Sequence, residues 1–213
     1  VGSCIASVLA DLGGIGLLVN NAGAGHRGTL EQLSGEELAQ AMDLNFFGVA
    51  RVTKAVLPAM RTARAGRVIT VTSLNGVVAL PFSDAYNAAK FAVEGLMESL
   101  ATVMREFGVY VSVVEPGPVR TAFFANVGGH VDDVSGDDPY AELLNRFNTR
   151  ITALGSAGQS PESVADVIVE IAADPSPALR YQPSEQAHAF AAQKLVDTTG
   201  RSILDATGAL LHP

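Results

Sequence analysis

Three short apolar runs along the chain have the character of strands buried on both faces. They span Leu17–Gly23, Arg67–Ser73 and Val109–Glu115. Each run is almost continuously hydrophobic before it ends in polar or small residues, which is typical of strands in a parallel sheet. Segments with helical periodicity separate the runs. The pattern therefore predicts an α/β fold with a doubly wound, mostly parallel sheet flanked by helices.

Two helices are predicted in the first third of the chain. Cys4–Leu12 is helix-like, and the glycine-rich segment Gly13–Gly16 is interpreted as its C-cap and connector. Ser34 opens a capping box, which predicts a helix continuing to about Arg64. Pro58 lies inside this helix and is expected to bend it.

The remainder of the chain contains two further predicted helices and a short strand. One helix begins near Asp84, after a proline, and runs to Phe107 with Gly108 as its stop. Another begins at the N-cap Ser160, with a proline in its first position. Leu179–Tyr181 is predicted as a last short strand. The apolar stripe expected on the Ser160 helix is Val164, Val167, Ile168 and Ile171.

Polar, small or turn-forming residues follow the predicted strands at the points where they end. Asn21, Ala22 and Gly23 follow the first strand, Ser73 ends the second, and Pro116 follows the third. In an open α/β sheet, ligands bind outside the carboxyl ends of the strands, so these residues are candidates for a binding site. Taken one at a time, they are equally consistent with ordinary strand termination.

Tyr86 and Lys90 provide the first sign of chemistry. They lie four residues apart on a predicted helix and therefore share a face. A lysine held beside a tyrosine favours the phenolate, so Tyr86 is expected to exchange protons with a substrate at ordinary pH. The same spacing occurs by chance in many helices, so the companion residues at the strand ends decide the interpretation.

Composition narrows the possible partners and places the chain in one domain. The 213 residues include 48% hydrophobic residues and carry a net charge of −8, so we expect one α/β domain over residues 1–213. The absence of a Lys/Arg cluster argues against nucleic acid and anionic membranes as partners. No apolar run approaches the ~20 residues of a membrane span. Cys4 is the single cysteine, which fits a reducing compartment, and we expect a cytoplasmic protein.

Several motifs together resemble the short-chain dehydrogenase/reductase family. Asn20–Gly23, Asn45, Ser73, Tyr86 with Lys90, and Pro116–Gly117 occur in the family's order and at its spacing. The resemblance covers most of the chain and implies a Rossmann-like fold. The segment from Leu80 to Leu100 resembles more narrowly the 17β-hydroxysteroid and retinol dehydrogenase branch.

The resemblance implies an NAD- or NADP-dependent interconversion of a secondary alcohol and a ketone. Tyr86 would be the general acid/base, and Ser73 would hydrogen-bond the reacting oxygen. Lys90 would lower the pKa of Tyr86 and reach the nicotinamide ribose. Asn45 would hold a water, although an exposed or back-bonded amide is the alternative for this residue. The cofactor-binding residues would be Asn21, Ala22, Gly23, Tyr86, Lys90, Pro116, Gly117, Val119 and Thr121.

Residues 121–160 are predicted to form a mobile substrate lid with an apolar inner face, with a plain pair of surface helices as the alternative. The apolar positions are Phe123, Phe124, Val127, Tyr140, Leu143, Leu144 and Phe147. They favour an apolar substrate, such as a steroid or retinoid. His130, Asp132 and Asp133 lie in the intervening loop, where solvated side chains are more usual than a metal site, so no metal is expected.

The chain departs from the family pattern at its start. The family opens with a strand, a glycine-rich phosphate loop and a helix, whereas Gly13–Gly16 follows a helix and leads into a strand. We therefore expect about 60 to 70 further residues before Val1, at ~30 per strand-helix-strand unit. Without them, Leu17–Asn20 would be an exposed, aggregation-prone edge.

The alternatives to an oxidoreductase are an inactive relative and an epimerase or dehydratase. A relative without activity would have no physical need for Asn45, Ser73, Tyr86 and Lys90 together. A sugar epimerase or dehydratase uses a similar Tyr/Lys pair but usually has a longer C-terminal domain.

The resemblance further implies a homodimer or homotetramer formed through the helices that begin near Ser34 and Asp84. The apolar residues expected to contribute from the second helix are Phe91, Leu96, Met97 and Leu100.

Overall fold

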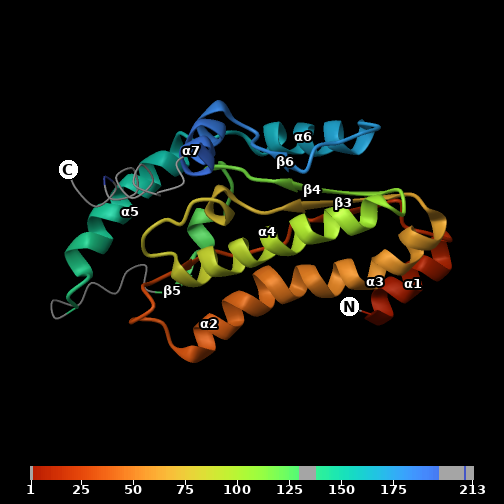
Figure 1. The fold of residues 1–213 in the computed structure, drawn as a ribbon. Helices are drawn as coiled ribbons and strands as arrows, with labels where there is room; N and C mark the ends of the chain where they lie inside the picture. The colour runs from red at the N-terminus through yellow and green to blue at the C-terminus, as the bar shows by residue number, and fades with distance from the viewer. Residues whose placement is uncertain (1, 130–137, 197–208, 210–213) are drawn as a thin grey trace.

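The structure is a computed structural model that describes residues 2–129, 138–196 and 209. Its main sheet has four parallel strands in the order β1-β3-β4-β6 (Figure 1). These are β1 (Leu17–Asn20), β3 (Gly66–Val71), β4 (Val109–Val114) and β6 (Arg180–Tyr181). The predicted α/β fold with a parallel sheet is confirmed, and the strands begin and end within three residues of the predicted positions.

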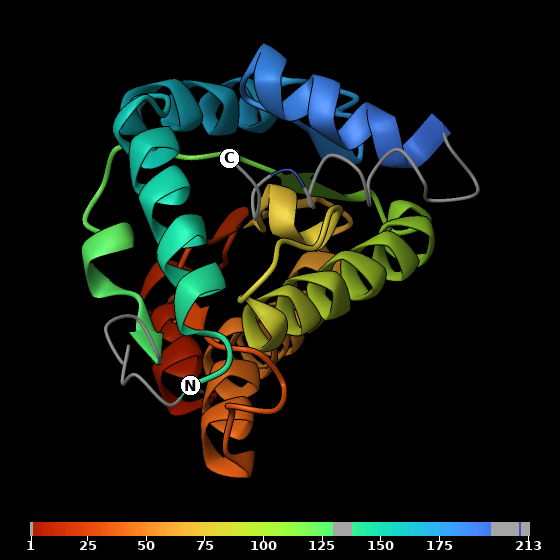
Figure 2. The same cartoon turned by 90° about the vertical axis from the view of Figure 1, so that its left-hand side faces the viewer.

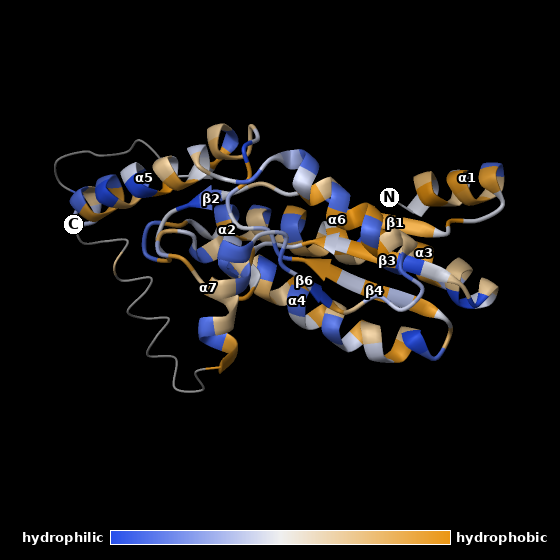
Figure 3. Ribbon diagram, turned by 90° about the horizontal axis from the view of Figure 1, so that it is seen from above, coloured by the Kyte–Doolittle hydropathy of each residue, from blue (hydrophilic) through white to orange (hydrophobic). Residues whose placement is uncertain are grey.

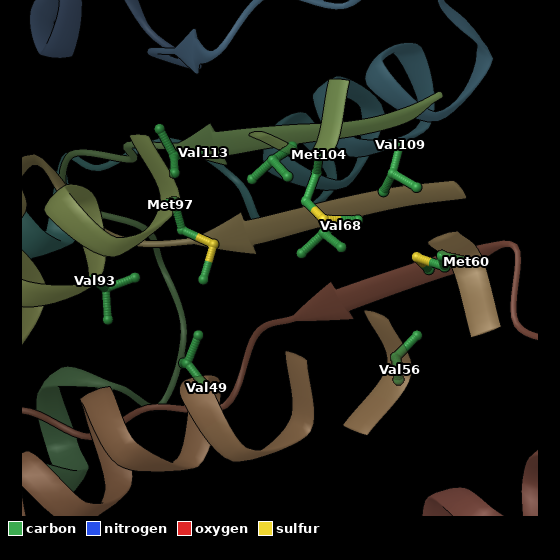
Figure 4. Packing of buried hydrophobic residues seen from close by; sticks show 10 residues of the cluster. Val49, Val56, Met60, Val68, Val93, Met97, Met104, Val109 and Val113 are labelled. Carbon is green, nitrogen blue, oxygen red and sulfur yellow. The ribbon is translucent and has the colours of Figure 1, made fainter. Parts of the chain in front are cut away.

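Alternation along β3 sends neighbouring side chains into two separate cores. Val68 packs with residues of α3 (Gly48–Ala63) and α4 (Asp84–Arg105), whereas Ile69 packs with α6 (Pro161–Ala173). Both side chains are fully buried. Figure 4 shows Val68 among the labelled valines and methionines of the first core. Burial of this kind contributes about 1.5–3 kcal/mol per side chain and fixes helices on both faces of the sheet.

The helix predicted from Ser34 to about Arg64 is interrupted by a π-helical turn. It consists of α2 (Gly35–Met42), the π-helix η1 (Asp43–Phe47) and α3. The predicted capping box is present at Ser34, and α3 continues through Pro58. The prediction of one continuous helix was therefore wrong at η1. Apolar periodicity does not reveal a single wide turn, which often marks a functional position.

Glycines end the helices as predicted at two positions. Gly13 follows α1 (Gly2–Leu12) with φ of +72°, and its N–H donates to Leu9 O at 3.0 Å. Gly108 follows α4 with φ of +70°, and a Cβ at this position would collide with the Arg64 carbonyl. Both positions need the left-handed backbone that glycine adopts without strain.

Short elements and α5 enclose one end of the molecule. β2 (His26–Arg27) pairs with β5 (Gly128–Gly129) in a second small sheet. Figure 2 shows α5 (Ala141–Ser156) running across this end between the α6 side and the α2 side. The remaining elements are η2 (Leu74–Gly76), η3 (Phe124–Asn126) and α7 (Glu185–Val196).

The edge of the main sheet formed by β1 is open to solvent within the described ranges. β1 pairs with β3 on one side only, and Leu17 and Val19 are 43% and 37% exposed. α1, largely orange in Figure 3, has no buried residue. The expected exposed edge at Leu17–Asn20 is therefore present. No described helix is long and apolar enough to cross a membrane.

One residue assigned to self-association has a different role. Met97 is fully buried, and its sulfur accepts a hydrogen bond from Thr70 Oγ1 at 3.5 Å. It was a wrong choice because it faces β3 rather than a partner. Leu96 and Leu100 are partly buried against the same core, and Phe91 lies under Lys194, whose Nζ is 4.2 Å from the ring centroid.

Candidate active site

A cavity of about 850 Å³ opens at the carboxyl ends of β1, β3 and β4. This volume is within the range of ligand sites. Its lining includes most of the predicted site residues, namely Asn21, Gly23, Ser73, Tyr86, Lys90, Pro116, Gly117, Val119 and Thr121. Asn45 and Ala22 were also predicted, but neither lines the cavity. The sheet thus brings together residues that are up to 100 positions apart in the sequence.

The first turns of α4 place Tyr86 and Lys90 side by side in the cavity wall. Tyr86 is 8% exposed and Lys90 is 4% exposed. Lys90 Nζ lies 5.7 Å from the centroid of the Tyr86 ring and donates to Val71 O at 3.3 Å. The helix spacing and the end of β3 together hold the ammonium next to the phenol.

The pKa values of Tyr86 and Lys90 do not favour the expected phenolate at neutral pH. Burial raises the pKa of Tyr86 to about 12, and hydrogen bonding to Ser73 only partly offsets this effect. Burial also lowers the pKa of Lys90 to about 8, against the opposing influence of Glu94. Desolvation dominates both groups in this structure, and the lowering of the Tyr86 pKa by Lys90 stays a prediction. Tyr86 is consequently a protonated donor at neutral pH.

Ser73 is held in the same wall by a short hydrogen-bonded loop. Its Oγ accepts from Asn75 N at 3.0 Å, as the N-cap of η2. Asn75 Nδ2 then donates to Asn87 Oδ1 at 2.8 Å, and Asn87 Nδ2 donates to Leu80 O at 2.8 Å. Because Asn87 follows Tyr86 on α4, this chain of hydrogen bonds fixes the Ser73 loop relative to the tyrosine.

Asn45 lies behind the cavity wall, in the π-helical turn. It is 1% exposed and exchanges two hydrogen bonds with Ala24, donating to its carbonyl at 3.0 Å and accepting from its N–H at 3.1 Å. It also donates to Ala41 O at 3.0 Å. The Asn45 side chain therefore bonds back to its own helix at Ala41 and also to Ala24 in the segment after β1. These bonds hold that segment beside Lys90.

The residues at the strand ends fit the nicotinamide half of a dinucleotide cofactor. A Cβ at Gly23 would lie 2.9 Å from Asn45 Oδ1 and 3.4 Å from Lys90 Nζ, so only glycine keeps this approach open. Pro116 and Gly117 line the facing side, and Leu74 N donates to Pro116 O at 2.9 Å. This cradle of small residues with one buried cation suits a ribose and a flat amide ring.

Aromatic and aliphatic side chains from the predicted lid form the outer wall. Phe123, Phe124, Val127 and Ile151 line the cavity, and the Phe123 ring centroid lies 5.8 Å from that of Tyr86. Leu144 and Phe147 are instead fully buried in a core with Phe82. The mobility of residues 121–160 stays a prediction. His130, Asp132 and Asp133 lie outside the described residues.

Two groups of polar residues at the site were not found from the sequence. His26 and Arg27 line the cavity, together with Ser83. Glu94 lies one turn after Lys90, is 5% exposed, and accepts a hydrogen bond from Arg180 Nη1 at 2.5 Å. The i+4 spacing from Lys90 to Glu94 was a usable signal. For His26 and Arg27 the signal was a pair of polar side chains shortly after the strand-end segment Asn21–Gly23.

Comparisons with known proteins agree with this geometry. The family described as short chain dehydrogenase matches residues 1–131. Human retinol dehydrogenase 8 is 36% identical, over 99% of this chain and 68% of its own length. Human 17-beta-hydroxysteroid dehydrogenase type 1 is 38% identical, over 91% of this chain and 60% of its own length. The chain thus spans roughly two thirds or less of these relatives.

Solved structures lead to the same family. A short-chain dehydrogenase from Streptomyces avermitilis superposes with a TM-score of 0.81 at 31% identity, covering 98% of this chain and 74% of that one. A metagenomic short-chain oxidoreductase in complex with NADP superposes with a TM-score of 0.63 at 27% identity, covering 86% and 68% of the two chains. With its motifs gathered around one cavity, the chain belongs to the short-chain dehydrogenase family.

Proposed function

We propose that this protein is an NAD(P)-dependent oxidoreductase that interconverts a secondary alcohol and a ketone. The observation that carries the proposal is the convergence of Tyr86, Ser73 and Lys90 in one cavity wall beside the small-residue cradle at Gly23 and Pro116. When bound, the nicotinamide supplies or accepts the hydride. All other requirements of the reaction fall on side chains of this chain.

Tyr86 supplies the proton in the reductive direction. A phenol with a pKa of about 12 is protonated at neutral pH and can donate to the carbonyl oxygen of a ketone. The Ser73 hydroxyl hydrogen-bonds the same oxygen as negative charge develops, a contribution typically worth ~3 kcal/mol. The Lys90 ammonium stabilises the phenolate left after transfer and holds the ribose. Asn45 maintains the strand end against which both lie.

The body of the substrate is proposed to be apolar. Phe123, Phe124, Val127 and Ile151 supply the outer wall of the cavity. Hydrophobic walls with a few polar anchors are usual for sites of this kind. The names of the relatives, a retinol dehydrogenase and a hydroxysteroid dehydrogenase, are consistent with this choice. Self-association and a cytoplasmic location remain predictions.

Replacement of Tyr86 by Phe tests the assignment of the general acid. The ring and its packing remain, so Tyr86→Phe should fold normally and lose ~100-fold or more in kcat. Turnover is followed by nicotinamide absorbance over a panel of apolar ketones and alcohols. Tyr110→Phe is the matched control, since Tyr110 stacks with Arg67 and does not line the cavity. Wild-type kcat in a folded Tyr86→Phe protein would refute the assignment.

A further inference from the structure

Arg27 is a buried cation in the wall of the substrate cavity, and none of the described carboxylates pairs with it. It is 8% exposed, and Phe82 and Phe147 form part of the core beside it. Its Cζ lies 4.9 Å from the centroid of the Phe147 ring. Burial lowers its pKa to about 10, so the guanidinium still carries its charge at neutral pH.

Most of the donor capacity of Arg27 is unused. A guanidinium has five N–H donors, and the single hydrogen bond it makes to a described residue runs from Nη1 to Ser83 Oγ at 2.8 Å. Nε is buried without a partner. No described carboxylate lies within ion-pair distance of it. A charge buried in this way is strongly unfavourable unless something pairs with it.

The position of Arg27 relative to the reacting centre suits a second anchor for the substrate. Ser83 is the N-cap residue of α4, and Tyr86 follows it three positions later. Three residues correspond to about 4.5 Å along a helix axis. Arg27 and Ser83 both line the cavity that holds Tyr86 and the apolar wall. One ligand can therefore contact the general acid, the aromatic side chains and the guanidinium.

We propose that the Arg27 guanidinium, supported by the Ser83 hydroxyl, binds a carboxylate on the substrate, so that the preferred substrates are apolar alcohols or ketones ending in an acid group. The proposal rests on the proposed function in taking this cavity as the substrate site. The planar fork of arginine pairs with a carboxylate through two parallel hydrogen bonds. The ligand thereby supplies a counter-charge that no described residue provides to Arg27.

A structural role for Arg27 makes a different prediction. The Ser83 hydrogen bond and the contact with Phe147 tie β2 to α4 and α5. If that were the whole role, substitution would alter stability without altering the discrimination between charged and neutral ligands. The deciding quantity is therefore a ratio of affinities within each variant.

Calorimetric titration with decanoate, 1-decanol and decyl phosphate, with and without NADP, tests the proposal independently of hydride transfer. Wild type should bind decanoate about tenfold or more tightly than decanol, which a charge-assisted pair readily supplies. Arg27→Gln should bring the ratio close to one. Arg67→Gln is the matched control, because Arg67 also stacks on a ring and has an unpartnered nitrogen but lies outside the cavity.

Each result has a defined meaning. Equal affinity for decanoate and decanol in wild type, or an unchanged ratio in Arg27→Gln, would overturn the proposal. Tighter binding of decyl phosphate than of decanoate would overturn the choice of a carboxylate and assign a phosphate instead. Because no turnover is needed, the anion preference can hold while Tyr86-dependent reduction fails, and the reverse can also occur, so the two proposals fail separately.

Discussion

Arg180 and Arg27 are both drawn into the protein, yet their surroundings are opposite. Arg180 Nη1 contacts Glu94 at 2.5 Å and Glu115 at 2.6 Å, and its Nη2 contacts Glu98 at 2.6 Å. Arg27 is more deeply buried, with one serine hydroxyl as its described hydrogen-bond partner. Among the described residues, three carboxylates pair with Arg180 and none pairs with Arg27.

The difference indicates that Arg180 has a structural role and that Arg27 has a role in ligand binding. The Arg180 cluster joins elements that position the active site, because Glu94 lies one turn after Lys90 on α4, and Glu115 precedes Pro116. Gln182 completes it by donating to Glu115 at 2.6 Å. The ion pairs of this cluster hold strand ends in place. An unpaired cation in a cavity wall instead costs stability and is retained where it contacts a ligand.

The largest effect on stability is expected for Arg180→Met. Removing the cation leaves Glu94 and Glu115 buried without a counter-charge, so unfolding free energy should fall by about 3–5 kcal/mol. Denaturant unfolding measures the loss. Adding Glu94→Gln and Glu115→Gln to Arg180→Met should recover part of it, because the stranded carboxylates are then neutral. A loss below about 1 kcal/mol would show that the cluster is not structural.

An intermediate effect is expected in the pH dependence of stability. Burial, reinforced by Glu115, raises the pKa of Glu94 from 4.5 to about 7. As pH rises through this interval, the unfolded chain loses the Glu94 proton first, so the folded protein holds the extra proton and stability falls. The contribution is at most about 3.5 kcal/mol at ~1.4 kcal/mol per pKa unit.

Glu94→Gln should remove this contribution and flatten the stability profile between pH 4.5 and 7. Thermal unfolding across this range, with the variant compared against wild type at each pH, provides the measurement. Glu98→Gln is the matched control, since Glu98 contacts the same arginine but its side chain is 62% exposed. Parallel profiles for wild type and Glu94→Gln would mean that Glu94 stays ionised throughout.

The smallest effect is expected for Arg27→Met. The substitution removes a desolvated charge but also loses the Ser83 hydrogen bond and the ring contact, so the two changes should nearly cancel, within about 1 kcal/mol. Unfolding is measured under the conditions used for Arg180→Met. A loss as large as that of Arg180→Met would make the two arginines equivalent and would weaken the case for a ligand at Arg27.

Residue order alone determined the architecture and most of the site. Continuous apolar runs predicted β1, β3 and β4, because strands covered on both faces need no polar alternation. Glycines at positions 13 and 108 marked helix ends, where a left-handed backbone is required. Ser73, Tyr86 and Lys90 were identified by type and spacing, since a parallel sheet brings its carboxyl ends together.

Only the tertiary structure decided the state and surroundings of the charges. The protonated Tyr86 and the depressed pKa of Lys90 follow from burial, which depends on what packs around α4 rather than on the four-residue spacing. The π-helical turn that seats Asn45 is equally invisible to periodicity. Likewise, Arg180 meets Glu94 and Glu115 across 86 and 65 residues of chain, whereas Arg27 meets no described carboxylate. Such pairings depend on three-dimensional distance and desolvation, which sequence separation does not encode.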